Sequence, residues 1–136
     1  MSIKEKIFLA RIAEQAERYD DMVHFIKEII KDKLEDYNSD ERNLLSVGFK
    51  NQITSKRTAI RTIASIKKNP RYQKYRSALN KFQAKLEQEL YNQCIEIVNL
   101  IKSDCIDKAS NDESRAFFYK IVGNYYRYVA ESAKGD

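Results

Sequence analysis

Residues that turn a polypeptide chain are unusually scarce in this sequence. One proline, Pro70, and three glycines serve 136 residues. Helices end mainly where proline, glycine or a polar cap interrupts the apolar pattern, so these few interruptions predict a small number of long helices and no strand meander. Charged residues make up 33% of the chain and hydrophobic ones 43%, which is typical of a folded, helix-rich chain. We expect an all-α fold comprising one domain or part of one.

The apolar pattern of the first half of the chain indicates three helices. Apolar residues recur at helical spacing over residues 3–16 and again over residues 20–35. Asn38 is followed three residues later by Glu41, a capping-box pattern that marks the start of a helix. The third helix is expected to run from this signal to about residue 68.

Two further helices are predicted in the second half. Pro70 suits the first position of a helix, and the apolar pattern continues from there to about residue 105. Residues 110–113 form a second capping-box pattern, which opens a fifth helix reaching about residue 132. Gly135 is expected to turn the chain after it. Long helices joined by short connections predict an antiparallel bundle or solenoid.

The fifth helix is unusual because apolar and aromatic side chains surround nearly its whole circumference. A helix that is apolar on all sides is buried on all sides, and four preceding helices can cover only part of it. We therefore expect something C-terminal, or a partner chain, to pack on the rest. The residues concerned are Phe117, Phe118, Tyr119, Ile121, Val122, Tyr125, Tyr126, Tyr128 and Val129.

Two helices carry basic faces. At a rotation of about 100° per residue, Lys50, Arg57 and Arg61 fall within about 40° of one another on the third helix. Lys120 and Arg127 fall within about 20° on the fifth. If both faces look into one groove, five cations converge there. Basic residues at this spacing are also typical of a plain solvated helix face.

Converging cations of this kind suit a phosphate group. A phosphoryl group carries about −1.5 to −2 charges at pH 7 and three strong acceptor oxygens. Arginine matches it with a fork of two hydrogen bonds, and lysine adds a point charge. Tyr128 could donate one more hydrogen bond, and Glu131, one turn beyond Arg127, could hold that guanidinium in place.

Three stretches of the chain resemble the 14-3-3 family. They are residues 13–22 (AEQAERYDDM), residues 41–51 (ERNLLSVGFKN) and residues 125–131 (YYRYVAE). The similarity extends over nearly all 136 residues and corresponds to the first five helices of that family. The resemblance implies a nine-helix antiparallel fold that forms one wall of a cup-shaped dimer. Residues 1–136 would then be the dimerisation region and part of the groove, either as an excised N-terminal half or as a short relative.

The resemblance also implies a phosphopeptide-binding function. Each 14-3-3 protomer has a groove for phosphoserine or phosphothreonine peptides, and later helices of the family complete it. By resemblance, the phosphate is held by Lys50, Arg57, Arg127 and Tyr128, with Lys120 nearby. Arg61 is assigned to the rim of the groove. The expected role is a dimeric adaptor that regulates phosphorylated client proteins in signal transduction.

Dimer contacts are implied in the same way, and they come from the first four helices. Ile12, Ala16, Arg18 and Asp21 of one protomer are expected to meet Ala59, Ile63, Ile66, Phe82, Lys85 and Glu89 of the other. Arg18 with Glu89, and Asp21 with Lys85, would be ion pairs. Exposed pairs of this kind contribute about 0–1 kcal/mol, so burial of apolar surface should dominate. The expected partner is a second 14-3-3 protomer, in a homodimer or a heterodimer. The alternative is that these residues are ordinary bundle core and surface.

Other functions are less well supported by the residues. His24 is the single histidine, and the chain has no nucleophile elbow, Gly-rich phosphate loop or metal-ligand spacing, so we expect no enzyme, cofactor or metal. The main alternative function is a helical protein–protein interaction scaffold that is indifferent to phosphate. The net charge of +5 is modest, and we expect Lys and Arg to be interleaved with Asp and Glu along every helix, as on a solvated surface, so bulk charge is weak evidence for nucleic acid. A nucleic-acid binder is a distant third possibility, and neither nucleic acid nor membrane is expected as a partner.

The cysteines and the apolar runs indicate the compartment. Cys94 and Cys105 lie ~16 Å apart along one helix axis at 1.5 Å per residue, too far for a disulfide within that helix. No apolar run of about 18 residues exists that would span a membrane. A cytoplasmic or nuclear location is expected.

Overall fold

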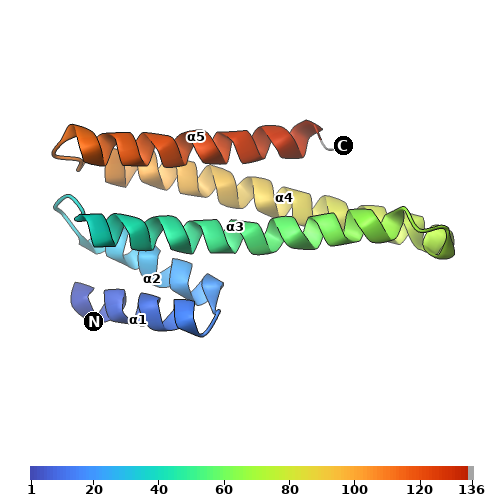
Figure 1. Ribbon diagram of the computed structural model, residues 1–136, viewed down its shortest axis with the longest axis horizontal. Helices are drawn as coiled ribbons and strands as arrows, with labels where there is room; N and C mark the ends of the chain where they lie inside the picture. Colours follow the sequence, from blue (N-terminus) through green and yellow to red (C-terminus); the bar gives the residue numbers. More distant parts are fainter. Residues whose placement is uncertain (135–136) are drawn as a thin grey trace.

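The computed structural model describes residues 1–134, with side-chain surroundings for residues 1–130. It is all-α over that range, with α-helices at Ile3–Gln15 (α1), Tyr19–Asp32 (α2), Ser39–Lys67 (α3), Arg76–Leu100 (α4) and Asp112–Lys134 (α5). Neighbouring helices run antiparallel (Figure 1). Helices α3 and α4 form a long hairpin whose tip projects beyond the other helices, while α1 and α2 pack at one side and α5 runs along α4 (Figure 1). The expected all-α, antiparallel arrangement of five helices is confirmed.

The predicted capping box at the start of α3 is confirmed. The Asn38 side chain accepts a hydrogen bond from the Glu41 amide at 2.8 Å, and Glu41 Oε1 accepts one from the Asn38 amide at 2.8 Å. Two amides that the helix itself leaves unpaired are satisfied in this way. Helix α2 ends at Asp32, three residues before the predicted boundary, because Lys33 is already extended, with φ −83° and ψ 120°.

The predicted cap of α5 is wrong by one residue. Asn111, rather than Ser110, caps the helix, and its side chain accepts a hydrogen bond from the Ser114 amide at 2.8 Å. Ser110 instead donates from its amide and its hydroxyl to Asp36 Oδ2, both at 2.8 Å. The predicted turn at Gly135 lies outside the described residues.

The predicted fourth helix is wrong at both ends. Pro70–Tyr75 is a 3-10 segment (η1), and it is interrupted at Tyr72, where φ is −106° and ψ is 16°. The side chain of Asn69 accepts a hydrogen bond from the Arg71 amide at 3.0 Å and so closes the turn. At the other end, α4 passes at Leu100 into a π-helical turn, Ile101–Ile106 (η2). Both deviations leave the long α3–α4 hairpin intact.

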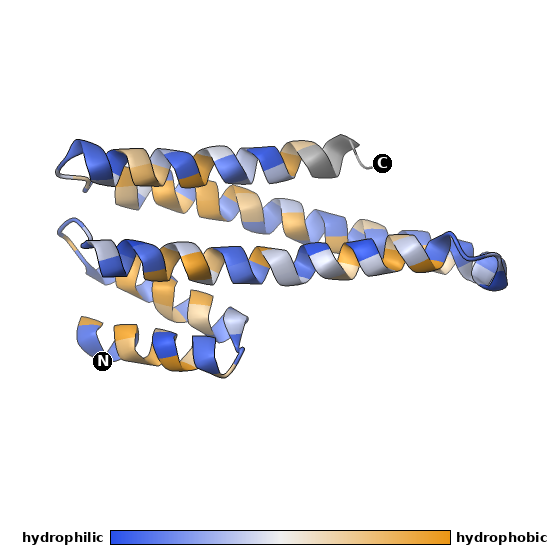
Figure 2. Cartoon of the chain, viewed as in Figure 1, coloured by the Kyte–Doolittle hydropathy of each residue, from blue (hydrophilic) through white to orange (hydrophobic). Residues whose placement is uncertain are grey.

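The core lies where α2, α3, α4 and α5 meet. Hydrophobic residues recur among hydrophilic ones along the helices (Figure 2). Gly48 permits the closest approach of α2 to α3, because a Cβ atom there would lie 2.2 Å from the Ile26 Cδ1 atom. The largest fully buried side chains are Phe49, Phe118, Met22, Ile26, Ile29, Ile30, Leu45, Ile53, Ile97, Ile101, Val23 and Val98.

Asp36 ties the start of α5 to the connection between α2 and α3. Besides Ser110, its carboxylate accepts hydrogen bonds from the Ser114 hydroxyl at 2.9 Å and the Tyr37 amide at 2.7 Å. Burial raises the pKa of Asp36, but these hydrogen bonds outweigh burial and hold the pKa below its ordinary value. Lys108 adds a second tie, since its ammonium bonds the Ile30 carbonyl at 2.8 Å at the end of α2. These contacts set the position of α5 relative to α3.

Helix α5 is only partly covered, as expected. Phe118, Ile121, Val122 and Tyr125 are buried against the rest of the protein. On other sides of the same helix, Tyr119 is 58% exposed and Tyr126 is 45% exposed. The described residues therefore cover part of an apolar helix and leave two tyrosines in solvent.

Candidate functional site

A pocket of about 310 Å³ lies between α3 and α5. Both helices pack on α4, which sets the distance between them. Among residues 1–130, no Asp or Glu lines the pocket, so none of these residues neutralises its two lysines from within its walls. The lining residues are Ser46, Lys50, Phe117, Lys120, Ile121, Asn124, Tyr125 and Tyr128.

Three of the five predicted phosphate-binding residues line this pocket. Lys50 comes from α3, and Lys120 and Tyr128 come from α5. A fourth, Arg57, adjoins it, because its guanidinium carbon lies 4.4 Å from the centroid of the Tyr128 ring. This cation–π contact joins the two helices and places the Arg57 charge beside the Tyr128 phenol. The basic faces of α3 and α5 therefore meet at Tyr128.

The fifth predicted residue, Arg127, lies at the edge of the pocket. It is exposed, and its Nη2 donates a hydrogen bond to Asn124 Oδ1 at 3.0 Å. Asn124 itself lines the pocket. Arg61 is exposed and does not line the pocket, and its assignment to the rim stays a prediction. Glu131, predicted to hold the Arg127 guanidinium, lies outside the described side chains.

Ser46 and Asn124 are pocket residues that the sequence reasoning missed. Each lies four residues before a predicted site residue, Ser46 before Lys50 and Asn124 before Tyr128. Residues four apart share a helical face, so the spacing itself could have indicated both. They add a hydroxyl and an amide to the two lysines.

Two residues of the pocket lining, Ile121 and Tyr125, are buried. Tyr125 is 4% exposed, and its ring meets that of Tyr128 edge to face, with centroids 5.5 Å apart. Burial raises the pKa of the Cys94 thiol on α4 to about 11, partly opposed by the charge of Arg57. The thiol is therefore protonated at neutral pH and is a poor nucleophile. Buried surroundings strengthen the attraction between nearby cations and an anion, because they screen charges less than water does.

The residues predicted for a dimer interface form a partly apolar outer surface. Ile12 is 43% exposed, Ile66 is 39% exposed and Phe82 is 50% exposed, whereas Ile63 is buried within the protomer. Ala59, half-buried, lines a small pocket between the α1–α2 connection, α3 and α4.

Three of the four charged members of this set, Arg18, Asp21 and Glu89, have partners within their own chain. Arg18 Nε contacts Asp21 Oδ2 at 2.8 Å, and Glu89 Oε2 accepts a hydrogen bond from the Lys56 ammonium at 3.0 Å. The hydrogen bond from Lys56 also holds the pKa of Glu89 below its ordinary value. Inter-protomer pairs of Arg18 with Glu89 would have to compete with these contacts. Ala16 and Lys85 are exposed.

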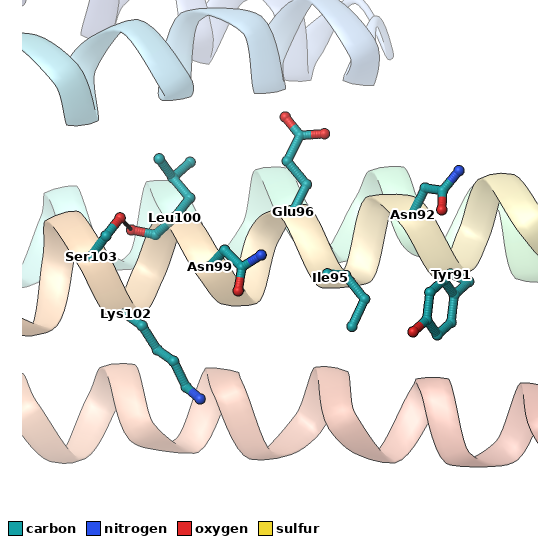
Figure 3. A pocket seen from close by; sticks show the side chains of 8 residues that line it. All are labelled: Tyr91, Asn92, Ile95, Glu96, Asn99, Leu100, Lys102 and Ser103. Atoms are coloured by element: carbon teal, nitrogen blue, oxygen red, sulfur yellow. Dashed lines mark hydrogen bonds between the residues drawn. The ribbon is translucent and has the colours of Figure 1, made fainter.

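A wider, shallower hollow lies on the outer face of α4 and contains none of the predicted site residues (Figure 3). Its one carboxylate, Glu96, is paired with Lys27 of α2. Its one cation, Lys102, donates a hydrogen bond to the Tyr126 hydroxyl at 2.8 Å. A single cation that already has a partner is a weak anion site, so the pocket between α3 and α5 is the better candidate.

The described residues contain no group of three or more His, Cys, Asp and Glu side chains that could hold a metal ion. None of the described helices combines the length and apolar character needed to cross a membrane. His24 lies on the surface, with its Nε2 at 2.8 Å from Glu28 Oε2. Cys94 and Cys105 are both buried and free.

Comparison with known proteins identifies the family. The family model described as 14-3-3 protein matches residues 9–136. The chain is 40% identical over 134 residues to 14-3-3 protein zeta of Bombyx mori, covering 98% of this chain and 54% of the relative. It is 38% identical over 137 residues to a 14-3-3-like protein of Solanum tuberosum, covering 98% and 53%. It is 40% identical to 14-3-3-like protein 2 of Caenorhabditis elegans, covering 98% and 54%.

These matches, together with the five-helix fold, show that the chain belongs to the 14-3-3 family. The chain spans about half the length of the curated relatives it matches. In this chain, the matched residues include the pocket between α3 and α5 and the exposed apolar surface of α1, α3 and α4.

Proposed function

We propose that the pocket between α3 and α5 binds the phosphate of a phosphoserine or phosphothreonine peptide, and that the protein acts as a regulatory adaptor for phosphorylated clients. The observation that carries the proposal is the convergence of Lys50, Lys120 and Tyr128 on one pocket, to whose lining the described side chains contribute no acidic group. Arg57 adds a third positive charge against the Tyr128 ring. A site of this kind captures a phosphate by charge and hydrogen bonding and leaves it chemically intact.

Each side chain has a distinct part in the proposed capture. Lys50 and Lys120 supply point charges from opposite walls, and Arg57 and Arg127 supply guanidinium forks that match two phosphate oxygens at once. The Tyr128 hydroxyl donates one further hydrogen bond. Because the residues come from two helices that are both packed on α4, the site is formed before the ligand arrives, which lowers the entropic cost of binding.

The test compares two peptides that differ only in one phosphate. The 136-residue chain, labelled with ¹⁵N, is titrated with a phosphoserine peptide and with its unphosphorylated form, and binding is followed by NMR chemical shifts. The phosphopeptide is expected to shift the amides of Lys50, Lys120 and Tyr128 and to saturate. Binding is expected to be weak, because the family resemblance assigns the remaining peptide contacts to later helices.

Equal binding of the two peptides would contradict the proposal. It would favour a phosphate-independent scaffold, with the peptide held by the apolar walls at Phe117 and Ile121.

We further propose that residues 1–136 form the dimerisation region as well as this part of the groove. The support is the exposed apolar surface of Ile12, Ile66 and Phe82, which a second protomer would cover. Burial of apolar surface stabilises an interface by about 25 cal/mol per Å² removed from water. Two grooves in one dimer would let a client with two phosphosites bind through effective concentration.

Replacing Phe82 with aspartate is expected to convert a dimer into a monomer. An aspartate would place an unpaired charge in an apolar contact, which is costly to bury. Sedimentation velocity measures the change, and Tyr91→Asp is the matched control because Tyr91 is on the same helix and 46% exposed, against 50% for Phe82. A wild-type chain that sediments as a monomer, or a Phe82→Asp variant that stays dimeric, would contradict the proposed interface.

A further inference from the structure

The net charge of the chain conceals a strongly uneven distribution. Residues 42–86 contain twelve Lys and Arg and no Asp or Glu. The remainder of the chain contains thirteen Lys and Arg and all twenty acidic residues. A net charge of +5 therefore describes neither part of the molecule.

Half of these cations gather at the tip of the α3–α4 hairpin. We call this surface the basic tip, and its cations are Lys67, Lys68, Arg71, Lys74, Arg76 and Lys81. They come from the end of α3, from η1 and from the start of α4, the segment that projects beyond the other helices (Figure 1). The tip is also hydrophilic throughout its turn (Figure 2).

The cations of the basic tip have no acidic partners. No carboxylate of the described residues forms an ion pair with any of the six. The sequence around them offers none, because residues 42–86 contain no Asp or Glu. Five of the six are exposed, and Lys67 is half-buried. Six cations without partners on one projection create a positive potential that attracts a polyanion.

Two exposed tyrosines are interleaved with these cations. Tyr72 is 37% exposed and Tyr75 is 54% exposed, and they alternate with basic residues in the order RYQKYR over residues 71–76. The Lys74 ammonium lies 5.2 Å from the centroid of the Tyr75 ring. Aromatic rings beside cations form a surface on which unpaired bases stack while the cations neutralise the phosphates.

We propose that the basic tip binds single-stranded nucleic acid. The cations account for contacts to the backbone, and Tyr72 and Tyr75 account for stacking. A lipid surface fits less well, because the turn exposes no large aliphatic side chain that could insert into the acyl region. Duplex fits less well too, because the exposed rings of Tyr72 and Tyr75 offer stacking surfaces, whereas the bases of a duplex are already stacked on one another. The expectation that acidic residues are interleaved with basic ones along every helix is wrong for residues 42–86, which contain no Asp or Glu. This proposal therefore revises the expectation that nucleic acid is not a partner.

The test is fluorescence anisotropy with a fluorescein-labelled 15-nucleotide oligouridine and the 136-residue chain. Binding is measured between about 50 and about 200 mM KCl, and the expected slope is about −0.7 in log K against log[KCl] for each phosphate neutralised. The Lys68→Gln, Arg71→Gln, Lys74→Gln triple variant removes three tip cations. It is expected to bind about tenfold more weakly at low salt, with the slope reduced in magnitude by about 2.

A matched triple variant separates the tip from general charge. Lys4→Gln, Arg11→Gln, Lys31→Gln removes three exposed cations from α1 and α2 and should bind as the wild type does. Tyr72→Gln with Tyr75→Gln should weaken binding by about tenfold and leave the salt slope unchanged, since stacking releases no counterions. Melting temperatures of all variants check that each is folded.

Several outcomes would overturn the proposal. One is an absence of oligouridine binding at about 50 mM KCl, where electrostatic contacts are strongest. Another is an equal loss of affinity in the two triple variants. A third is binding to vesicles of phosphatidylcholine and phosphatidylserine, lost in the tip variant, without binding to oligouridine, which would assign the tip to a membrane surface. Displacement of oligouridine by the phosphoserine peptide would place the nucleic acid in the pocket between α3 and α5.

Discussion

Replacing Arg57 with alanine is expected to remove most of the preference for a phosphorylated peptide. The affinity for the phosphopeptide should fall by about tenfold to a hundredfold, because charge-assisted hydrogen bonds contribute about 1.5–3 kcal/mol each. Affinity for the unphosphorylated peptide should hardly change. The Arg57 guanidinium carbon lies 4.4 Å from the centroid of the Tyr128 ring. Its loss would therefore remove a positive charge from the site and also the cation–π contact to the Tyr128 side chain.

Two further variants separate the contribution of the Arg57 guanidinium shape from that of its positive charge. Arg57→Lys keeps the charge but loses the planar fork, so it should bind with an affinity between those of the wild type and the alanine variant. Arg11→Ala removes an exposed arginine from α1 and controls for the loss of one positive charge. The NMR titration with the two peptides measures all three variants. An Arg57→Ala variant that retained the full preference for phosphate would remove Arg57 from the site.

Replacing Phe118 with alanine is expected to destabilise the protein by about 3–5 kcal/mol, the usual cost of truncating a fully buried phenylalanine. Phe118 is 0% exposed. Its ring meets that of Tyr37 edge to face, with centroids 5.8 Å apart, and that of Phe117 with centroids 5.5 Å apart. The loss includes the transfer of the ring out of the core and the cavity that remains. Urea unfolding followed by circular dichroism measures it.

The neighbouring residue provides the control for this prediction. Tyr119 follows Phe118 directly in α5 but is 58% exposed, so Tyr119→Ala should change the free energy of unfolding by no more than about 0.5 kcal/mol. Similar losses in the two variants would mean that α5 is packed differently from the arrangement described. Because Phe118 anchors the helix that carries Lys120 and Tyr128, its loss should also weaken phosphopeptide binding.

The sequence predicted a helix start correctly where the residues that form the cap are close to each other in the chain. Asn38 and Glu41 form the predicted capping box because both partners lie within one turn of chain. The second predicted capping box does not form with Ser110, because Ser110 donates its hydrogen bonds to Asp36, a residue 74 positions away. The π-helical turn at the end of α4 was likewise unpredicted. It leaves Ile101 and Cys105 fully buried, an outcome that depends on packing against other helices.

The candidate site was predictable in part for the same reason. Helical periodicity grouped Lys50 with Arg57, and Lys120 with Arg127, because side-chain direction along a helix follows from residue spacing. Periodicity could not predict that Arg57 lies against Tyr128 or that Arg127 bonds Asn124. The first of these contacts depends on the distance between two helices, and the second depends on a choice of rotamer.

The sequence alone determined which residues share a helical face, since rotation per residue is a property of the backbone. It also determined the charge of each segment, including the acid-free stretch of residues 42–86. Only the tertiary structure decided which faces meet. Helices α3 and α5 both pack on α4, and that shared support places their basic faces across one pocket. The same packing leaves the hairpin tip outside the bundle (Figure 1), where its cations remain in solvent because no acidic helix covers them.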